Sequence, residues 1–375
     1  MKKFNIFFSN SISSQKWGGG EKWMLTAANG LKQRGHNTIL SGKANSEFLL
    51  RAQKADLNTI PLNIYADYSP FKIWHTKKIL QKHSVDVIVL NLNKDIRVAG
   101  VAARLAKVPV IIARNGIQLF SNKWKYKKTI SIVDGIITNS KSIQKAYNDF
   151  PWMNKKKTTV IYNGLKLRDT IDSYDLRKKW GIPKDNLVFV AAGRLTHQKG
   201  FDLLIEAVSK LKNSTRPFSI LIAGTGKDRD QLTSQIEKNQ LVDKIKLIGF
   251  QEDLDSILQS ADFVIMPSRQ EGMPNVVMEG MALGRPVLAA NVNGVPELMD
   301  HMKNGYIFEP LNVNAITQAI EFAIENHKSE KIASWCTNAK EHIAQNFTID
   351  KMLDNLEDYF HNKIKYHDIF LYQHF

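Results

Sequence analysis

The stretches Val87-Ile88-Val89-Leu90 and Val110-Ile111-Ile112-Ala113 decide the fold class of this 375-residue chain. Both runs are apolar at every position, whereas a strand with one solvated face alternates apolar and polar residues. Strands that are covered on both faces of a parallel sheet have this uninterrupted pattern. Helical periodicity over 70–82 and 95–105 separates such runs. The sequence therefore predicts alternating strand–helix units and a doubly wound α/β fold.

The same alternation extends along the whole chain. Strands are predicted at 4–9, 38–40, 85–90, 108–113, 135–138 and 158–162, and helices at 21–34, 70–82, 95–105 and 141–149. The series restarts with strands at 187–192, 219–223, 246–248, 263–266, 286–289 and 306–308, and helices at 202–211, 228–239, 254–259, 276–283, 313–327, 331–345 and 351–365. A polar stretch without clear periodicity, 163–183, separates the two series. We therefore predict domains of 1–167 and 168–348 and a last helical segment of 349–375.

Composition excludes several protein classes. Hydrophobic residues make up 43% and charged residues 23%, which is ordinary for a globular protein and excludes disordered and collagen-like chains. No apolar run reaches the ~18 residues that a membrane span needs. The start, Met1–Phe8, is typical of a first strand rather than a signal peptide. Cys336, the only cysteine, excludes an internal disulfide and a cysteine zinc site, and favours a reducing cytoplasm.

The positive charge lies in the first half of the chain. Residues 1–170 hold 29 lysines and arginines against nine acidic residues, whereas the remainder holds 23 against 27. Such asymmetry predicts an anionic partner, and a general bias towards lysine is the alternative. The basic residues are scattered over several helices and form no nucleic-acid-binding module, so nucleic acid is not expected as the partner.

Two polar clusters follow predicted strands in the second half. Glu271 lies in a loop after 263–266, Pro274 can open a helix, and Glu279 lies about one turn later. Backbone N–H groups at such a helix start suit a phosphate, and carboxylates suit vicinal sugar hydroxyls. Two ordinary surface glutamates beside a helix cap remain the alternative.

The second cluster, Gly193-Arg194-Leu195-Thr196-His197-Gln198-Lys199-Gly200, follows 187–192. Its two glycines allow tight turns, and Arg194 and Lys199 place two cations near a helix start. That environment suits a diphosphate, and a solvated basic loop is the alternative.

Together these blocks resemble the retaining glycosyltransferases of family four, of the bacterial cell-surface glycan type, whose GT-B fold has two Rossmann-like domains facing across a cleft. The resemblance covers nearly the whole chain. Its blocks are Gly18-Gly19-Gly20-Glu21, Tyr162-Asn163-Gly164, Gly193-Arg194-Leu195 with Lys199-Gly200, and Glu271-x7-Glu279 followed by Gly284-Arg285-Pro286-Val287.

The resemblance implies a role for each domain. The first is the acceptor domain, the second binds a nucleotide-sugar donor, and the last helix crosses back to the first. The implied catalytic residues are Arg194 and Lys199, which neutralise the leaving diphosphate, and Glu271, which holds sugar hydroxyls. The implied donor-binding residues are Gly18, Gly19, Arg194, Lys199, Phe250, Glu271, Gly272, Met273, Pro274, Asn275 and Glu279. Neither a metal nor a cofactor is implied, because the cations and the helix start supply the positive charge.

One departure from the family concerns the first domain. Many members carry a histidine after the strand equivalent to 108–113, where this chain reads Ala113-Arg114-Asn115-Gly116. Arg114 and Asn115 are candidates for the same sugar hydroxyl or for the acceptor, and Glu21 is a further acceptor candidate.

The expected function is retaining, metal-independent transfer of a hexose or N-acetylhexosamine, from UDP by preference, to a cell-surface or lipid-linked glycan such as lipopolysaccharide, O-antigen or capsule. A soluble transferase with a small acceptor and a non-catalytic nucleotide-sugar-binding protein are the alternatives. Lys123-Trp124-Lys125-Tyr126-Lys127-Lys128 interleaves cations with aromatic residues. It predicts docking on anionic headgroups at the inner face of the cytoplasmic membrane, with a solvated helix face as the alternative.

Overall fold

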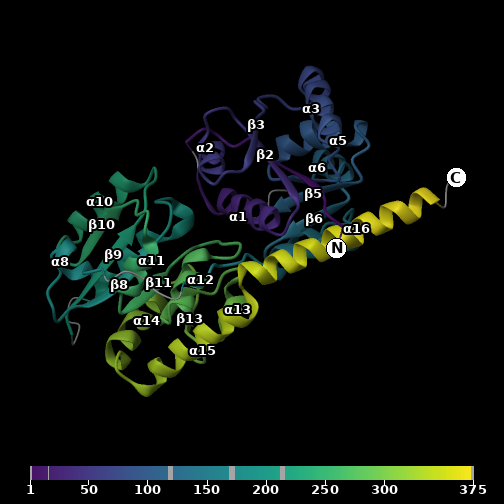
Figure 1. Cartoon of the computed structure of the whole chain (residues 1–375). Helices are drawn as coiled ribbons and strands as arrows, with labels where there is room; N and C mark the ends of the chain where they lie inside the picture. The colour runs from purple at the N-terminus through teal and green to yellow at the C-terminus, as the bar shows by residue number, and fades with distance from the viewer. Residues whose placement is uncertain (1, 16, 117–120, 169–173, 212–215, 373–375) are drawn as a thin grey trace. The chain divides into compact units, whose positions relative to one another are not determined.

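The computed structural model describes residues 2–15, 17–116, 121–168, 174–211 and 216–372, with side chains as far as residue 367. The chain forms two compact units (Figure 1). Unit 1 comprises Met1–Gly164 together with Ile349–Phe375, and unit 2 comprises Leu165–Thr348. Unit 1 is therefore built from both ends of the chain, and unit 2 from one continuous segment.

Unit 1 contains a seven-stranded parallel sheet in the order β3-β2-β1-β4-β5-β6-β7. Its strands are β1 (Asn5–Asn10), β2 (Asn37–Gly42), β3 (Asn58–Pro61), β4 (Val87–Leu90), β5 (Val110–Asn115), β6 (Gly135–Thr138) and β7 (Thr158–Val160). The strand order reverses direction at β1 and β4, whose register pairs Ile6 with Val87. Ligands of doubly wound sheets bind beyond the carboxyl ends of strands at such a reversal.

Helices cover both faces of this sheet. They are α1 (Gly19–Gln33), α2 (Glu47–Lys54), α3 (Pro70–Lys82), α4 (Asn93–Asp95), α5 (Val101–Leu105), α6 (Trp124–Ser131), α7 (Lys141–Asn148) and α16 (Ile349–Tyr372). A π-helical segment, Ile96–Gly100, joins α4 to α5, and Lys155–Lys157 forms a 3₁₀ turn. Two apolar clusters, one on each face, enclose β4 and β5, which explains why their sequences do not alternate.

Unit 2 repeats this architecture with a six-stranded parallel sheet in the order β10-β9-β8-β11-β12-β13. Its strands are β8 (Leu187–Ala192), β9 (Phe218–Ala223), β10 (Ile245–Gly249), β11 (Phe263–Met266), β12 (Val287–Ala290) and β13 (Tyr306–Phe308). Its helices are α8 (Leu176–Trp180), α9 (Phe201–Lys210), α10 (Arg229–Lys238), α11 (Leu254–Gln259), α12 (Asn275–Ala282), α13 (Val295–Leu298), α14 (Val313–Asn326) and α15 (Glu330–Asn346), with a 3₁₀ turn at His197–Lys199. The strand order reverses at β8 and β11.

The predicted α/β fold with two doubly wound sheets is confirmed, and the differences concern short elements. β3, α2, α6, α8 and α13 were not among the predicted elements. β3 is a four-residue edge strand without a fully buried position, so it lacks the apolar pattern of the inner strands. The five-residue helix α8 lies inside 163–183, the stretch without clear periodicity, and its C-cap is Gly181, whose φ is +58°. The helix predicted over 95–105 is interrupted by the π segment.

The last helix, α16, completes the core of unit 1 (Figure 1). Its apolar side chains recur at helical spacing and join the cluster beneath β1 and β2: Met352, Leu353, Leu356, Tyr359, Phe360 and Ile364. The helix approaches α1 at Gly30, where an added Cβ would lie 2.4 Å from a methyl carbon of Leu353. A side chain at position 30 would therefore require Leu353 to shift, which makes glycine the residue that suits this close packing of α1 against α16.

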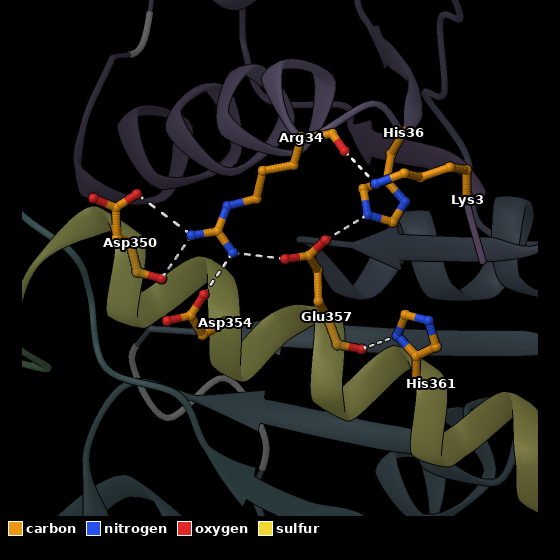
Figure 2. A network of polar contacts seen from close by, with 7 residues as sticks. All are labelled: Lys3, Arg34, His36, Asp350, Asp354, Glu357 and His361. Carbon is orange, nitrogen blue, oxygen red and sulfur yellow. Dashed lines mark hydrogen bonds and ion pairs between the residues drawn. The ribbon is translucent and has the colours of Figure 1, made fainter. Parts of the chain in front are cut away.

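A polar network fastens α16 to the end of α1 and the start of β2 (Figure 2). Arg34 donates to Glu357 Oε2 at 2.6 Å and to Asp354 Oδ1 at 2.7 Å. Nε2 of the buried His36 lies 2.8 Å from Glu357 Oε1. His36 Nδ1 accepts from the Phe4 N–H at 3.1 Å, so Nε2 carries the proton and donates to Glu357. Glu357 thus joins two elements that lie more than 300 residues earlier in the chain.

We expect Glu357→Gln to lower the free energy of unfolding by about 2 kcal/mol at pH 7, because a nearly buried carboxylate with two partners is lost. Burial raises the pKa of Glu357, but hydrogen bonds from His36 and Arg34 outweigh it and lower that pKa below its ordinary value. The stabilisation is therefore complete above the unfolded pKa of about 4.3, and it is lost as pH falls through the lower folded value.

Urea denaturation of both proteins between pH 7 and about pH 3 checks this, since the difference in stability should shrink in acid. Asp354→Asn is the matched control: its side chain is 64% exposed, so its loss should change stability by less than about 0.5 kcal/mol. A Glu357→Gln effect that stays constant with pH would contradict the assignment.

Candidate functional site

In unit 1, polar side chains gather where the strands end. Asn10 ends β1, Asn91 follows β4, and Arg114 and Asn115 end β5, while Asn163 follows β7. All five residues are at least 90% buried. Because the carboxyl ends of parallel strands meet at one edge of the sheet, the fold concentrates these groups beside the start of α1.

Arg114 is the central cation of this edge. Its guanidinium lies 4.7 Å from the centroid of the Trp23 ring, and Nη2 donates to Asn163 Oδ1 at 3.1 Å. Burial lowers the pKa of Arg114 to about 10, with the nearby Glu21 charge acting in the opposite direction, so the group stays protonated at neutral pH. With only 4% of its surface exposed, Arg114 is placed to hold neighbouring groups in position.

Arg114 also contacts the two glycine-containing turns at this edge. A Cβ at Gly116 would lie 2.7 Å from Arg114 Nη1, and a Cβ at Gly20 would lie 3.7 Å from the same atom. The Asn91 side chain lies 3.4 Å from the Gly20 Cβ position. The start of α1 at Gly20 therefore lies beside the ends of β4 and β5, at distances that are ordinary van der Waals contacts.

Glu21, in the first turn of α1, is 5% exposed and accepts from Asn10 Nδ2 at 3.0 Å. A carboxylate there is favoured by the helix dipole. Oε2 of Glu21 lies 3.4 Å from the Cβ position of Gly18, so Gly18 of the predicted glycine loop lies beside this carboxylate. Gly19 is the first residue of α1.

Asn115 stands out because both polar atoms of its amide are buried without a hydrogen-bond partner among the described residues. Oδ1 of Asn10 has the same status. A buried polar atom without a partner costs about 1–3 kcal/mol, so such atoms call for an explanation in structural or functional terms. They mark this edge as a candidate binding region for polar groups.

In unit 2, the loops after β8 and β11 are joined to one another. Gly200 has φ +67°, and a Cβ there would lie 2.1 Å from the Pro267 carbonyl oxygen, so only glycine fits. Arg269 pairs with both carboxylate oxygens of Asp202 at 2.6 Å each. Its backbone N–H also donates to the Gln198 carbonyl at 2.8 Å. The two predicted clusters therefore form one region at the reversal of strand order.

Lys199 and Glu271, which are 72 residues apart in the chain, meet in this region. Lys199 Nζ lies 2.5 Å from Glu271 Oε1, and Ser268 Oγ donates to the same oxygen at 2.7 Å. The Glu271 backbone N–H donates to Asn293 Oδ1 at 3.3 Å. The Lys199 side chain is 19% exposed and that of Glu271 8%, so the pair is largely removed from water.

The other predicted donor residues lie around the same edge of unit 2. Arg194 is exposed in the loop after β8. Gly272, Met273 and Pro274 are buried before α12, where Pro274 is the N-cap and not the first helical residue as predicted. Asn275 opens α12 and is partly exposed, Glu279 is buried in its second turn, and Phe250, directly after β10, is 55% exposed.

Sequence reasoning missed several residues that support these two regions. In unit 1 they are Asn10, Trp23 and Asn91, and in unit 2 they are Ser268, Asn293 and the Asp202–Arg269 pair. Asn10, Asn91 and Ser268 have a signal that could have been used, because each lies within two residues of the end of a predicted strand. Trp23 and Asn293 carry no such signal.

Two family models match successive parts of the chain. The model described as "Glycosyltransferase Family 4" matches residues 17–169, and that described as "Glycosyl transferases group 1" matches residues 172–342. Together they span most of both units, and β1 and α16 of unit 1 lie outside the matched residues.

Individual proteins with similar sequences include an uncharacterized glycosyltransferase of Haemophilus influenzae, which is 25% identical over 87% of this chain and 91% of its own length. The UDP-Gal:alpha-D-GlcNAc-diphosphoundecaprenol alpha-1,3-galactosyltransferase of Escherichia coli is 26% identical over 75% of this chain and 76% of its own. Among solved structures, Anabaena Alr3699/HepE in complex with UDP and glucose superposes with a TM-score of 0.84 at 22% identity, covering 96% of this chain and all of that one.

We expect Lys199→Met to lower the free energy of unfolding by about 3 kcal/mol, because it leaves the Glu271 carboxylate buried without its counter-ion. The double variant Lys199→Met/Glu271→Gln should recover part of that loss, since no charge is then stranded. Urea denaturation of the wild type, both single variants and the double variant measures the coupling energy between Lys199 and Glu271.

Arg194→Met, at the exposed cation of the same loop, is the control and should change the free energy of unfolding by less than about 0.5 kcal/mol. Additive single effects would show that the two side chains do not interact.

Proposed function

Since this chain belongs to the group 1 glycosyltransferases, with the GT-B fold, we propose that it transfers a hexose or N-acetylhexosamine from a nucleotide-diphosphate sugar, with retention at the anomeric carbon. The acceptor in this proposal is a cell-surface or lipid-linked glycan. The observation that carries the proposal is the Lys199–Glu271 pair at the reversal of strand order in unit 2, beside the start of α12.

The donor diphosphate is proposed to bind Arg194, Lys199 and backbone N–H groups at the start of α12. A phosphate oxygen near Lys199 Nζ competes with Glu271 for the ammonium, because both are anions. Donor binding would then release a Glu271 oxygen to accept from sugar hydroxyls, while the Ser268 hydroxyl keeps the carboxylate in place. Glu279 is proposed for the ribose hydroxyls, and Phe250 for the base.

UDP is the proposed nucleotide. Two findings support it: the Anabaena structure holds UDP and glucose, and the Escherichia coli relative is named for UDP-galactose. The relative's name also describes an acceptor sugar on a diphosphate-linked polyprenol. That name supports the proposal of a lipid-linked acceptor in lipopolysaccharide, O-antigen or capsule assembly.

The proposed chemical step needs no protein nucleophile. The bond between the anomeric carbon and the diphosphate oxygen breaks, the acceptor oxygen bonds to the same face of that carbon, and the acceptor proton passes to the leaving phosphate. Arg194 and Lys199 stabilise the developing negative charge of the diphosphate, and the fold positions the reactants. We propose that these cations make a divalent metal unnecessary.

Unit 1 is proposed to supply the acceptor side, with Glu21 and Asn115 as hydroxyl partners. Arg114 is covered by Trp23, so its proposed role is to position Asn163 and the glycine turns rather than to touch substrate. Gly18 and Gly19 would allow a ligand to approach the start of α1.

A peripheral position at the inner face of the cytoplasmic membrane is also proposed. It is supported by the basic first half of the chain, which suits anionic headgroups. Within the described residues, no helix is both long and apolar enough to cross a bilayer.

We expect UDP to raise the melting temperature more than GDP, ADP or CMP at equal concentration, because only the preferred nucleotide stabilises the folded state strongly. The shift should be the same with magnesium and with EDTA. Dependence on magnesium would contradict metal independence, and the absence of a shift with all four nucleotides would contradict the donor site.

Activity tests the assigned cation. Arg194→Ala should lower kcat/KM for UDP-sugar turnover by about 100-fold, because charge stabilisation of the leaving group is lost. Arg229→Ala, also an exposed arginine of unit 2, should leave turnover unchanged.

Proton NMR of the product tests retention: the transferred sugar should have the same anomeric configuration as in the donor. Transfer to a small soluble sugar at the same rate as to a lipid-linked glycan would favour a small-molecule acceptor.

A further inference from the structure

One face of α3 exposes aromatic side chains to solvent. Phe71 is 66% exposed and Trp74, one turn later, is 53% exposed. Lys78 follows on the same face, with Nζ 3.7 Å from the centroid of the Trp74 ring. The opposite face, with Thr76 and Leu80 buried, packs on unit 1. The outward face is thus apolar at its start and cationic towards its end.

The segment directly before α3 exposes two more aromatic rings. Tyr65 is 71% exposed and Tyr68 is 42% exposed. Tyr68 has φ +55°, a conformation that is unfavourable for a bulky residue and is held only where its surroundings require it. Asp67, between them, is paired with Arg97 at 2.6 Å, so the segment is anchored while its aromatic rings face outward.

The charge of this surface has one sign. α3 carries Lys72, Lys77, Lys78 and Lys82 and no acidic residue. Lys43 Nζ lies 5.6 Å from the Tyr65 ring. Asp67 is the only acidic residue between 57 and 85, and Arg97 neutralises it. Exposed aromatic rings surrounded by lysines match the boundary between headgroups and acyl chains in an anionic bilayer.

We propose that Tyr65, Tyr68, Phe71 and Trp74, with the lysines of α3, form the surface by which unit 1 docks on an anionic membrane. This proposal rests on the peripheral location proposed above. It assigns the membrane contact to α3 and the segment before it, which the sequence analysis did not identify as a docking surface. The predicted docking segment on α6 presents one fully outward ring, Trp124 at 79% exposure, while Tyr126 packs against the core.

A second copy of the chain fits this surface less well than a membrane does. Pairing two α3 faces would bring the lysines of both copies together without acidic partners, and like charges in contact oppose association. An anionic lipid surface satisfies both features, because the rings leave water while the ammonium groups meet phosphates. The occupant proposed is therefore lipid.

The test uses the full chain and vesicles of phosphatidylglycerol and phosphatidylethanolamine, with phosphatidylcholine vesicles as the neutral comparison. The wild type should sediment with the anionic vesicles only. Phe71→Ser/Trp74→Ser should weaken this binding by about tenfold or more, through lost ring burial. The matched control, Val242→Ser/Leu311→Ser, removes two exposed apolar side chains of unit 2 and should bind like the wild type.

A second measurement identifies the contacting ring. Brominated lipids quench tryptophans that enter the bilayer, so Trp74→Phe should keep vesicle binding and lose most of the quenching, whereas Trp124→Phe should retain it. Loss of quenching in Trp124→Phe alone would overturn the assignment and favour α6. Unchanged sedimentation of Phe71→Ser/Trp74→Ser would overturn it as well.

The UDP-induced rise in melting temperature, measured on the same preparations, separates this proposal from the proposed activity. If UDP binds but wild-type protein ignores anionic vesicles, the membrane surface is wrong and the transferase assignment stands. If the protein binds anionic vesicles but no nucleotide, the membrane surface stands and the proposed donor site is wrong. Gel filtration supplies a last check. If the wild type is a dimer and Phe71→Ser/Trp74→Ser is a monomer, this face mediates self-association and the proposal is overturned.

Discussion

Burial of the parallel strands on both faces is the constraint on which the rest of the structure depends. A strand that is covered by helices above and below favours apolar side chains at every position, as β4 and β11 show. Most of the polar groups of the two candidate regions therefore lie where strands end. Both units place buried or largely buried charged groups at the edge where the strand order reverses: Arg114 and Glu21 in unit 1, and Lys199 and Glu271 in unit 2.

The same constraint explains how much could be predicted from the sequence. Short, mainly apolar runs identified every inner strand, and the residues within five positions of their ends included Arg114, Asn115, Arg194 and Glu271. Partners could not be predicted where they depend on three-dimensional approach. The Lys199–Glu271 contact spans 72 residues, and the stacking of Arg114 on Trp23 joins residues from β5 and α1. Short elements such as β3 lack the pattern because they lie at an edge.

The two regions differ in how they hold their cations. In unit 1, Arg114 is enclosed by an aromatic ring, an asparagine and two glycine turns, so its charge stabilises the shape of the edge itself. In unit 2, Arg194 is open to solvent and Lys199 is paired with the Glu271 carboxylate. The cation of unit 1 is thus enclosed by its surroundings, whereas unit 2 has one exposed cation and one that is paired with a carboxylate.

The discontinuous construction of unit 1 has a consequence for biosynthesis. Leu353, Leu356 and Phe360 of α16 fill the cluster beneath β1 and β2, and Glu357 provides the partner of Arg34 and His36. During translation these groups emerge only after all of unit 2 has been made. Until then the apolar cluster built from residues 1–164 lacks the side chains of α16, whereas unit 2, a single segment, already has all of its residues. Unit 1 is therefore completed after unit 2, although its strands are synthesised before it.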